Sequence, residues 1–153
     1  MVDQASLKHP TLELRAPDVP TLLDDTIAIA ALWRSLAHYL VYNLELNRNI
    51  DAIGRAIVVE NKWRAQRYGV RGTFIGHGGA ISVASLVDQV IEDLTKDADA
   101  LGCLAELQRC RTIVSSGTSA DTQMAVYERT GKTGGRARAL AAVTDWLAET
   151  TLR

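Results

Sequence analysis

Residues 11–33 read TLELRAPDVPTLLDDTIAIAALW and combine the signals for a strand, a turn and a long helix. Apolar and charged residues alternate over residues 11–15, so Glu13 and Arg15 share one face of a predicted strand. Pro17 ends this strand. A strand without neighbours cannot pair its backbone N–H and C=O groups, and we therefore expect it to need partner strands that this chain does not supply.

The chain beyond this strand is predicted to be mostly helical. Apolar residues recur at helical spacing from Leu22 to about Leu46, and Asp24 and Asp25 are favourably placed in the first turn. A second helix is expected over residues 50–68 and should pack antiparallel to the first. Further periodicities predict helices over residues 82–95, 97–114 and 119–129, and a last one with Leu140, Val143, Trp146 and Leu147 facing inward.

Serine, aspartate and glycine residues mark the predicted helix boundaries. Ser82 or Ser85 is expected to cap the third helix, and Asp97 or Asp99 the fourth. Residues 131–135 read GKTGG and predict a flexible loop before the last helix.

A small hairpin is predicted where two β-prone segments, residues 73–75 and 80–82, are separated by glycines. The predicted fold class is therefore α+β and mostly helical, in a single domain over residues 1–153. It contains one strand near its start, at most one small hairpin, and about five or six helices.

Composition excludes several classes of protein. The 153 residues are 47% hydrophobic and 23% charged, which fits one globular domain. Seventeen Lys and Arg residues against eighteen Asp and Glu give a net charge of -1, so no nucleic acid or anionic membrane partner is expected.

Localisation is predicted from three further signals. The apolar stretch from Thr26 to Trp33 is too short to span a membrane, and the amino terminus lacks the pattern of a signal peptide. Cys103 and Cys110 are expected on one helix face, two turns apart, where they cannot form a disulfide with each other. We therefore expect reduced thiols and a cytoplasmic protein.

Two interpretations of Glu13 and Arg15 follow from the residues alone. In the first, the pair is the solvated face of an edge strand. In the second, the carboxylate holds a divalent cation while the guanidinium grips a phosphate or a carboxylate with two hydrogen bonds. The strand period does not choose between them.

Three segments resemble the carboxyl-terminal part of type 2 glutamate-cysteine ligases and related carboxylate-amine ligases. The first is HPTLELRAPD at residues 9–18, followed by the Ala-rich helix from Ile27 to Leu32. The second is ENKWRAQRYG at residues 60–69. The third is GTSADTQ at residues 117–123, in which Ser119 stands where the family commonly has glycine.

The resemblance implies a glutamine synthetase-like fold and an ATP-dependent reaction that forms an amide through an acyl phosphate. It implies that Glu13 binds Mg²⁺ and that Arg15 is catalytic, in contact with the phosphate or the substrate. Because these ligases are usually more than twice as long, the chain looks like the carboxyl-terminal half of such an enzyme. The small-molecule carboxylate and amine would then bind in an active site completed by a separate chain carrying the amino-terminal half, or by self-association.

The second segment supplies candidate cofactor-binding residues. Consecutive helical residues point about 100° apart, so only Asn61 with Arg64, or Lys62 alone, could reach one ligand. Trp63 is expected in the core instead.

The three histidines are weaker candidates for site residues than the residues of the ligase-like segments. His9 lies beside the ligase-like strand and could line the same cleft, or be a surface turn residue. His38 and His77 lack a second His, Cys or carboxylate at ligand spacing, which argues against zinc.

Three functions remain open from the sequence. The first is a catalytic half of a carboxylate-amine ligase, active in a hetero-oligomer. The second is a non-catalytic helical subunit that stabilises a ligase-like partner. The third is a small self-sufficient enzyme built as a homo-oligomer, although the chain has few acidic residues for a full metal site.

Overall fold

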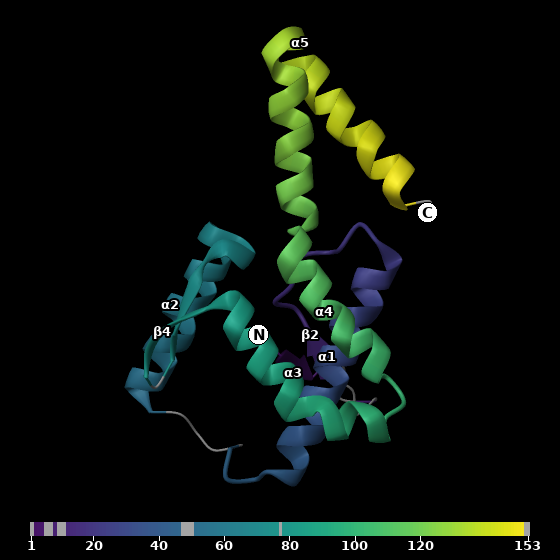
Figure 1. Cartoon of the computed structure of the whole chain (residues 1–153). Coiled ribbons are helices and arrows are strands. Elements are labelled where there is room, and N and C mark those ends of the chain that lie inside the picture. Colours follow the sequence, from purple (N-terminus) through teal and green to yellow (C-terminus); the bar gives the residue numbers. More distant parts are fainter. Residues whose placement is uncertain (1, 5–7, 9–11, 47–50, 77, 152–153) are drawn as a thin grey trace.

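The computed structural model describes residues 2–4, 8, 12–46, 51–76 and 78–151. Most of these residues are helical, as predicted, and two small antiparallel sheets accompany the helices (Figure 1). In chain order the elements are β1 (Val2–Gln4), β2 (Leu12–Leu14), α1 (Leu23–Tyr42), α2 (Ala52–Tyr68), the 3-10 turn η1 (Gly69–Arg71), β3 (Thr73–Gly76), β4 (Gly79–Ser82), α3 (Val83–Ala100), α4 (Leu104–Ser116) and α5 (Ser119–Thr151).

The core lies where α1, α3 and α4 pack against one another. Small residues on α1, Ala28 and Ala31, allow the three helices to approach closely around larger apolar side chains. The buried cluster consists of Ala28, Ala31, Ile91, Leu94, Ala98, Cys103, Leu107 and Cys110. The Ala-rich stretch of the sequence is thus the surface on which the bundle closes.

The amino-terminal strand has a partner within the chain, so the prediction of a strand without one is wrong. β2 pairs antiparallel with β1, with Val2 opposite Leu14 and Gln4 opposite Leu12. Residues 2–4 are too few to show a strand period, which is why the sequence did not reveal them. Among the described residues this sheet has only two strands, and sheets of that size need further packing to be stable.

The predicted hairpin is confirmed, but the predicted antiparallel pair of the first two helices is wrong. β3 and β4 pair from Thr73 opposite Ser82 to Gly76 opposite Gly79. α2 packs on β3 and η1, whereas α1 packs on α3 and α4. Apolar residues on α2 resemble a core-facing stripe in the sequence, yet no residue of this helix is buried.

The third helix begins as predicted and ends later than predicted. The Ser82 hydroxyl accepts a hydrogen bond from the Ser85 backbone N–H at 3.1 Å, which confirms the cap. α3 then continues to Ala100, so Asp97 and Asp99 lie inside it and do not cap α4.

The two cysteines do not share a helix. Cys103 precedes the first residue of α4, and Cys110 lies within that helix. Both are free and buried. Burial, and after it the charge of Asp25, raises the pKa of the Cys110 thiol, which keeps it protonated and unreactive.

A break between two helices falls at the glycines of residues 131–135, as predicted, but it is confined to Gly135, and residues 131–134 remain helical rather than forming a loop. Gly135 has a non-helical backbone, with φ 72° and ψ 176°, so α5 consists of two helices joined there by a sharp bend. Residues other than glycine rarely adopt this backbone conformation, so glycine at this position permits the bend. The last part of α5 folds back toward the start of α1 (Figure 1). On it Leu140 is exposed, against the prediction, while Val143, Trp146 and Leu147 are half-buried.

Within the described segments, no helix is both long enough and apolar enough to cross a bilayer.

Candidate functional site

Glu13 on β2 forms an ion pair with Arg15, which directly follows the last residue of that strand. The Arg15 Nη2 donates a hydrogen bond to the Glu13 Oε2 at 2.8 Å, so both side chains lie on the same strand face. The Arg15 side chain is 58% exposed and that of Glu13 is 42% exposed. Ion pairs this exposed contribute little to stability, while a ligand or a partner can still reach both charged groups.

Asn61 holds the hairpin against α2. Its Nδ2 donates to the Ile75 carbonyl oxygen at 2.9 Å, and its Oδ1 accepts from the Ile75 backbone N–H at 2.7 Å. Arg64 lies on the same side of the helix, where its Nη1 donates to the Thr73 hydroxyl at 3.3 Å and its Nε to the Glu60 Oε1 at 2.8 Å.

Lys62 and Trp63 lie away from the hairpin contacts. Lys62 is exposed, and Trp63 is half-exposed with its ring edge-on to Tyr68, the ring centroids 5.7 Å apart. The prediction of Trp63 as a core residue is wrong, because α2 lies outside the α1, α3 and α4 bundle.

The two hydrogen bonds between the Asn61 side chain and the Ile75 backbone, here called the Asn61 clamp, lead to a testable prediction. Asn61→Ala should destabilise the α2–hairpin unit by about 1–3 kcal/mol, because two backbone groups of Ile75 lose their partner. Amide hydrogen exchange at Ile75 should become faster by about tenfold or more. Lys62→Ala, one residue along the helix and exposed, is the matched control. Equal exchange rates at Ile75 in the two variants would contradict the clamp.

The turn before α5 is a helix cap tied to η1. Asp121 Oδ2 accepts hydrogen bonds from the Thr118 backbone N–H at 2.8 Å and from the Thr118 hydroxyl at 2.9 Å. The Asp121 backbone N–H donates back to the Thr118 hydroxyl at 3.4 Å, as in a capping box. Arg71 forms an ion pair with the same carboxylate. These hydrogen bonds, the backbone one first, lower the pKa of Asp121 below its ordinary value.

The lowered pKa predicts a pH-dependent contribution of Asp121 to stability. Its contribution is complete above the unfolded-state pKa and is lost as pH falls through the folded-state pKa, which is the lower of the two. Asp121→Asn should therefore lower the free energy of unfolding clearly at neutral pH and much less at strongly acid pH. Urea unfolding of both proteins at several pH values measures this difference. A difference that stays constant with pH would show that ionisation of Asp121 does not matter.

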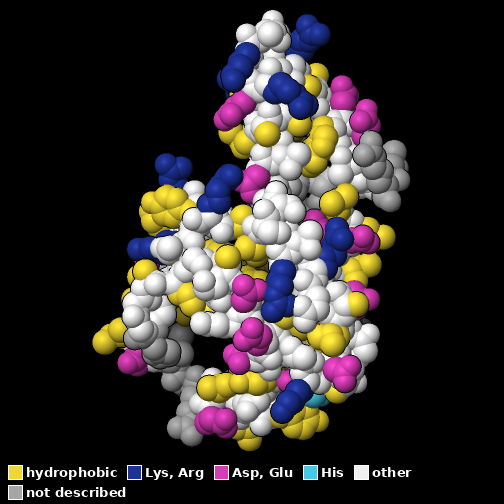
Figure 2. Space-filling model, in the orientation of Figure 1, with side chains coloured by type: hydrophobic (Ala, Val, Ile, Leu, Met, Phe, Trp, Pro, Cys, Tyr) yellow, Lys and Arg dark blue, Asp and Glu magenta, His cyan; other side chains and the backbone are white. Residues whose placement is uncertain are grey.

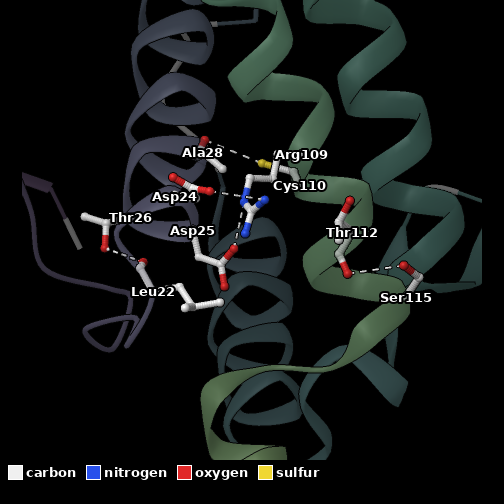
Figure 3. A network of polar contacts seen from close by, with 9 residues as sticks. All are labelled: Leu22, Asp24, Asp25, Thr26, Ala28, Arg109, Cys110, Thr112 and Ser115. Atoms are coloured by element: carbon white, nitrogen blue, oxygen red, sulfur yellow. Dashed lines mark hydrogen bonds and ion pairs between the residues drawn. The ribbon is translucent and has the colours of Figure 1, made fainter. Parts of the chain in front are cut away.

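A cavity of about 210 Å³ lies between the start of α1, the end of α4 and both halves of α5. Arg109 on α4 reaches α1, where its Nε donates to the Asp25 Oδ1 at 3.0 Å and its Nη1 lies 3.6 Å from the Asp24 Oδ2 (Figure 3). The hydroxyls of Thr21 and Ser119 hydrogen-bond to each other at its edge. The Arg109 guanidinium is paired with the carboxylates of Asp24 and Asp25, and the other polar side chains that line the cavity are mainly hydroxyl groups of Thr and Ser.

Sequence reasoning missed this cavity and a second polar pair. Arg109 and Asp25 are 84 positions apart, so no local pattern joins them. His38 Nδ1 lies 2.6 Å from the Asp97 Oδ1, a carboxylate that ligand spacing in the sequence did not reveal. His9 and His77 lie outside the described residues.

The predicted site residues fall into two groups. Glu13 and Arg15 are together at the end of β2, while Asn61 and Arg64 are together on the hairpin side of α2. β2 and the hairpin belong to different sheets. In the part of the chain that the structure covers, no three His, Cys, Asp or Glu side chains are grouped so that they could hold a metal ion.

Comparison with known proteins gives a consistent result. Residues 2–142 match the model of glutamate-cysteine ligase family 2 (GCS2). Relatives named "Putative glutamate--cysteine ligase 2" include one from Bradyrhizobium sp. (strain ORS 278), 50% identical over 147 residues, which cover 96% of this chain and 35% of the relative. One from Rhodospirillum rubrum is 40% identical over 151 residues, covering 96% of this chain and 39% of the relative. No solved structure matches the chain.

The chain matches only a part of each relative. A third relative with the same name, from Chloroflexus aggregans, is 35% identical over 149 residues, covering 94% of this chain and 36% of its own length. The chain thus spans little more than a third of the length of these curated relatives.

Proposed function

The chain belongs to glutamate-cysteine ligase family 2, and from this we propose that it is the carboxyl-terminal part of an ATP-dependent carboxylate-amine ligase. The reaction would join glutamate, or a similar carboxylate, to an amine. The observation that supports a catalytic role most directly is the solvent-accessible Glu13–Arg15 pair on a two-stranded sheet. The remaining two thirds of the ligase, as a separate chain or a further part of the polypeptide, would complete the active site.

The proposed chemistry has two steps. A carboxylate oxygen of the substrate attacks the γ-phosphorus of ATP, the bond to ADP breaks, and an acyl phosphate forms. The amine nitrogen then attacks the acyl carbon, inorganic phosphate leaves, and the nitrogen loses a proton. The Arg15 guanidinium would balance negative charge on the transferring phosphoryl group or orient the substrate carboxylate.

Glu13 fits a role as one ligand of a shared Mg²⁺ site. Magnesium is commonly held by one or two carboxylates together with phosphate oxygens and water, and Glu13 offers one accessible carboxylate. When bound, the cation would neutralise phosphate charge. The other protein ligands would come from outside the described residues, since these include no cluster that could hold a metal alone.

The residues on α2 would act on the nucleotide side of the site in two ways. Asn61 and Arg64 use their polar groups to hold the hairpin, so their role would be to position it. Lys62 is exposed, and its ammonium group would contact a phosphate. We further propose that the ligase works in the reducing cytoplasm, where both cysteines would stay free, and that it is hetero-oligomeric if its remaining part is a separate chain.

A reconstitution experiment tests the proposal. The chain and the unmatched part of the Bradyrhizobium sp. (strain ORS 278) relative would be produced singly and together, with ADP formation measured in the presence of glutamate, Mg²⁺ and an amine such as cysteine. We expect amine-dependent ADP formation from the combination alone. Activity of this chain by itself would overturn the proposed division of the active site, and an inactive but associated pair would overturn the catalytic role.

A further inference from the structure

Helix α2 exposes an apolar stripe of four residues. Ala52, Ala56, Val59 and Trp63 follow one another at spacings of four, three and four, which places them on one side of the helix. All four are exposed, Val59 at 68% and Trp63 at 50%. We call this set the α2 outer face.

The outer face is distinct from the side of α2 that holds the hairpin. Asn61 and Arg64, which contact β3, lie roughly 100° or more around the helix from Val59 and Trp63. Between the two sides, an apolar hollow of about 420 Å³ is lined by Ala52, Ile53, Ala56, Ile57, Glu60 and Ile75. Figure 2 shows hydrophobic side chains along the outer edge of the lobe that contains α2.

We propose that the α2 outer face is a docking surface for the part of the ligase that lies beyond the matched third of its relatives. Three observations favour this occupant. The face lies on the helix that carries the ligase-like segment of residues 60–69. The relatives carry about twice as much further polypeptide as the part matched here. No residue of α2 is buried by this chain, so the apolar residues of its outer face are accessible to a partner.

The size of the face also fits one part of a larger interface. A helix of 17 residues is about 25 Å long, so its apolar stripe supplies only a share of the roughly 800 Å² per partner that stable complexes bury. Trp63 would be its anchor, because exposed tryptophans are common among the residues that dominate binding. This inference rests on the proposed function, since it names the surface through which that partner binds.

The test compares two valines on helices. The chain carrying an affinity tag would be co-expressed with the unmatched part of the Bradyrhizobium sp. (strain ORS 278) relative, and the dissociation constant of the purified pair measured. Val59→Asp changes the outer face, and Val41→Asp changes an equally exposed valine, 62% exposed, on α1. We expect Val59→Asp to weaken binding by about 30-fold or more and Val41→Asp to leave it nearly unchanged. Circular dichroism of both variants checks that their helices remain.

The first three of the other outcomes overturn the docking surface, and the fourth overturns the proposed function alone. A pair that binds equally well with Val59→Asp would place the interface elsewhere while leaving the ligase function intact. Failure of the two parts to associate would show that the unmatched part of the ligase does not bind this chain. Concentration-dependent self-association of the chain that Val59→Asp abolishes would assign the face to a second copy. A pair that binds through the face but forms no ADP would refute the proposed function and leave the docking surface standing.

Discussion

Glu13→Ala and Arg15→Ala are each expected to reduce turnover of the reconstituted ligase by about 10² to 10⁴, with little change in folding. The large kinetic effect follows from the proposed roles, because a cation ligand and a guanidinium that balance phosphoryl charge act mainly in the transition state. The small effect on folding follows from exposure, since the Arg15 side chain is 58% exposed and that of Glu13 is 42% exposed. ADP formation and urea unfolding measure the two effects separately.

Conservative and matched variants separate chemistry from general charge effects. Glu13→Gln removes the charge and keeps the shape, and it should raise the Mg²⁺ concentration needed for half-maximal activity. Arg15→Lys keeps the charge but loses the planar pair of donors, so activity should be recovered only in part. Arg111→Ala breaks another exposed ion pair, with Asp88 at 2.7 Å, and should leave turnover unchanged. If Glu13→Ala and Arg15→Ala complexes turn over normally, the chain is a non-catalytic subunit.

Local features of the fold were predictable because their signals lie within a few residues. The Ser82 cap and the hairpin from Thr73 to Ser82 follow from side chains and glycines near the positions they control. The shared face of Glu13 and Arg15 follows from the strand period in the same way.

Features that depend on distant partners were not predictable. The apolar residues of α2 predict packing against α1, yet Asn61 fixes this helix to β3 and leaves Val59 and Trp63 exposed. The contact of Arg109 with Asp25 requires the α1 and α4 packing to be known first. Glycines at residues 131–135 predict a loop between two helices, and the structure has the break but confines it to Gly135, the one glycine of this stretch with positive φ.

The sequence indicates candidate site residues, whose roles stay predictions, and says little about their surroundings. The resemblance implies that Glu13 binds a metal, and among the described residues no three His, Cys, Asp or Glu side chains are grouped so that they could hold one alone. In the proposed ligase, the part of the relatives that this chain does not match would supply the other metal ligands and would cover the α2 outer face.

Leu107→Ala should be the most destabilising single core substitution tested, with a loss of about 2–5 kcal/mol in the free energy of unfolding. Leu107 is fully buried on α4, in the same cluster as Ala28 of α1 and Leu94 of α3. Because these neighbours are held by three helices, they cannot collapse fully into the space that the leucine leaves. A domain of this size is commonly stable by only about 5–15 kcal/mol, so the loss is a large share of the total.

Two further variants make this test specific, one that keeps most of the side-chain volume at the same position and one that removes a leucine side chain from an exposed position. Leu107→Met keeps most of the buried volume and should cost less than about 1.5 kcal/mol. Leu140→Ala removes the same atoms from a side chain that is 50% exposed on α5, and it should cost well under half as much as Leu107→Ala. Urea unfolding of the three variants, followed by circular dichroism, gives the comparison. Equal losses for Leu107→Ala and Leu140→Ala would mean that α1, α3 and α4 do not form the cooperative core, and that the bundle becomes tightly packed only when the rest of the ligase is bound.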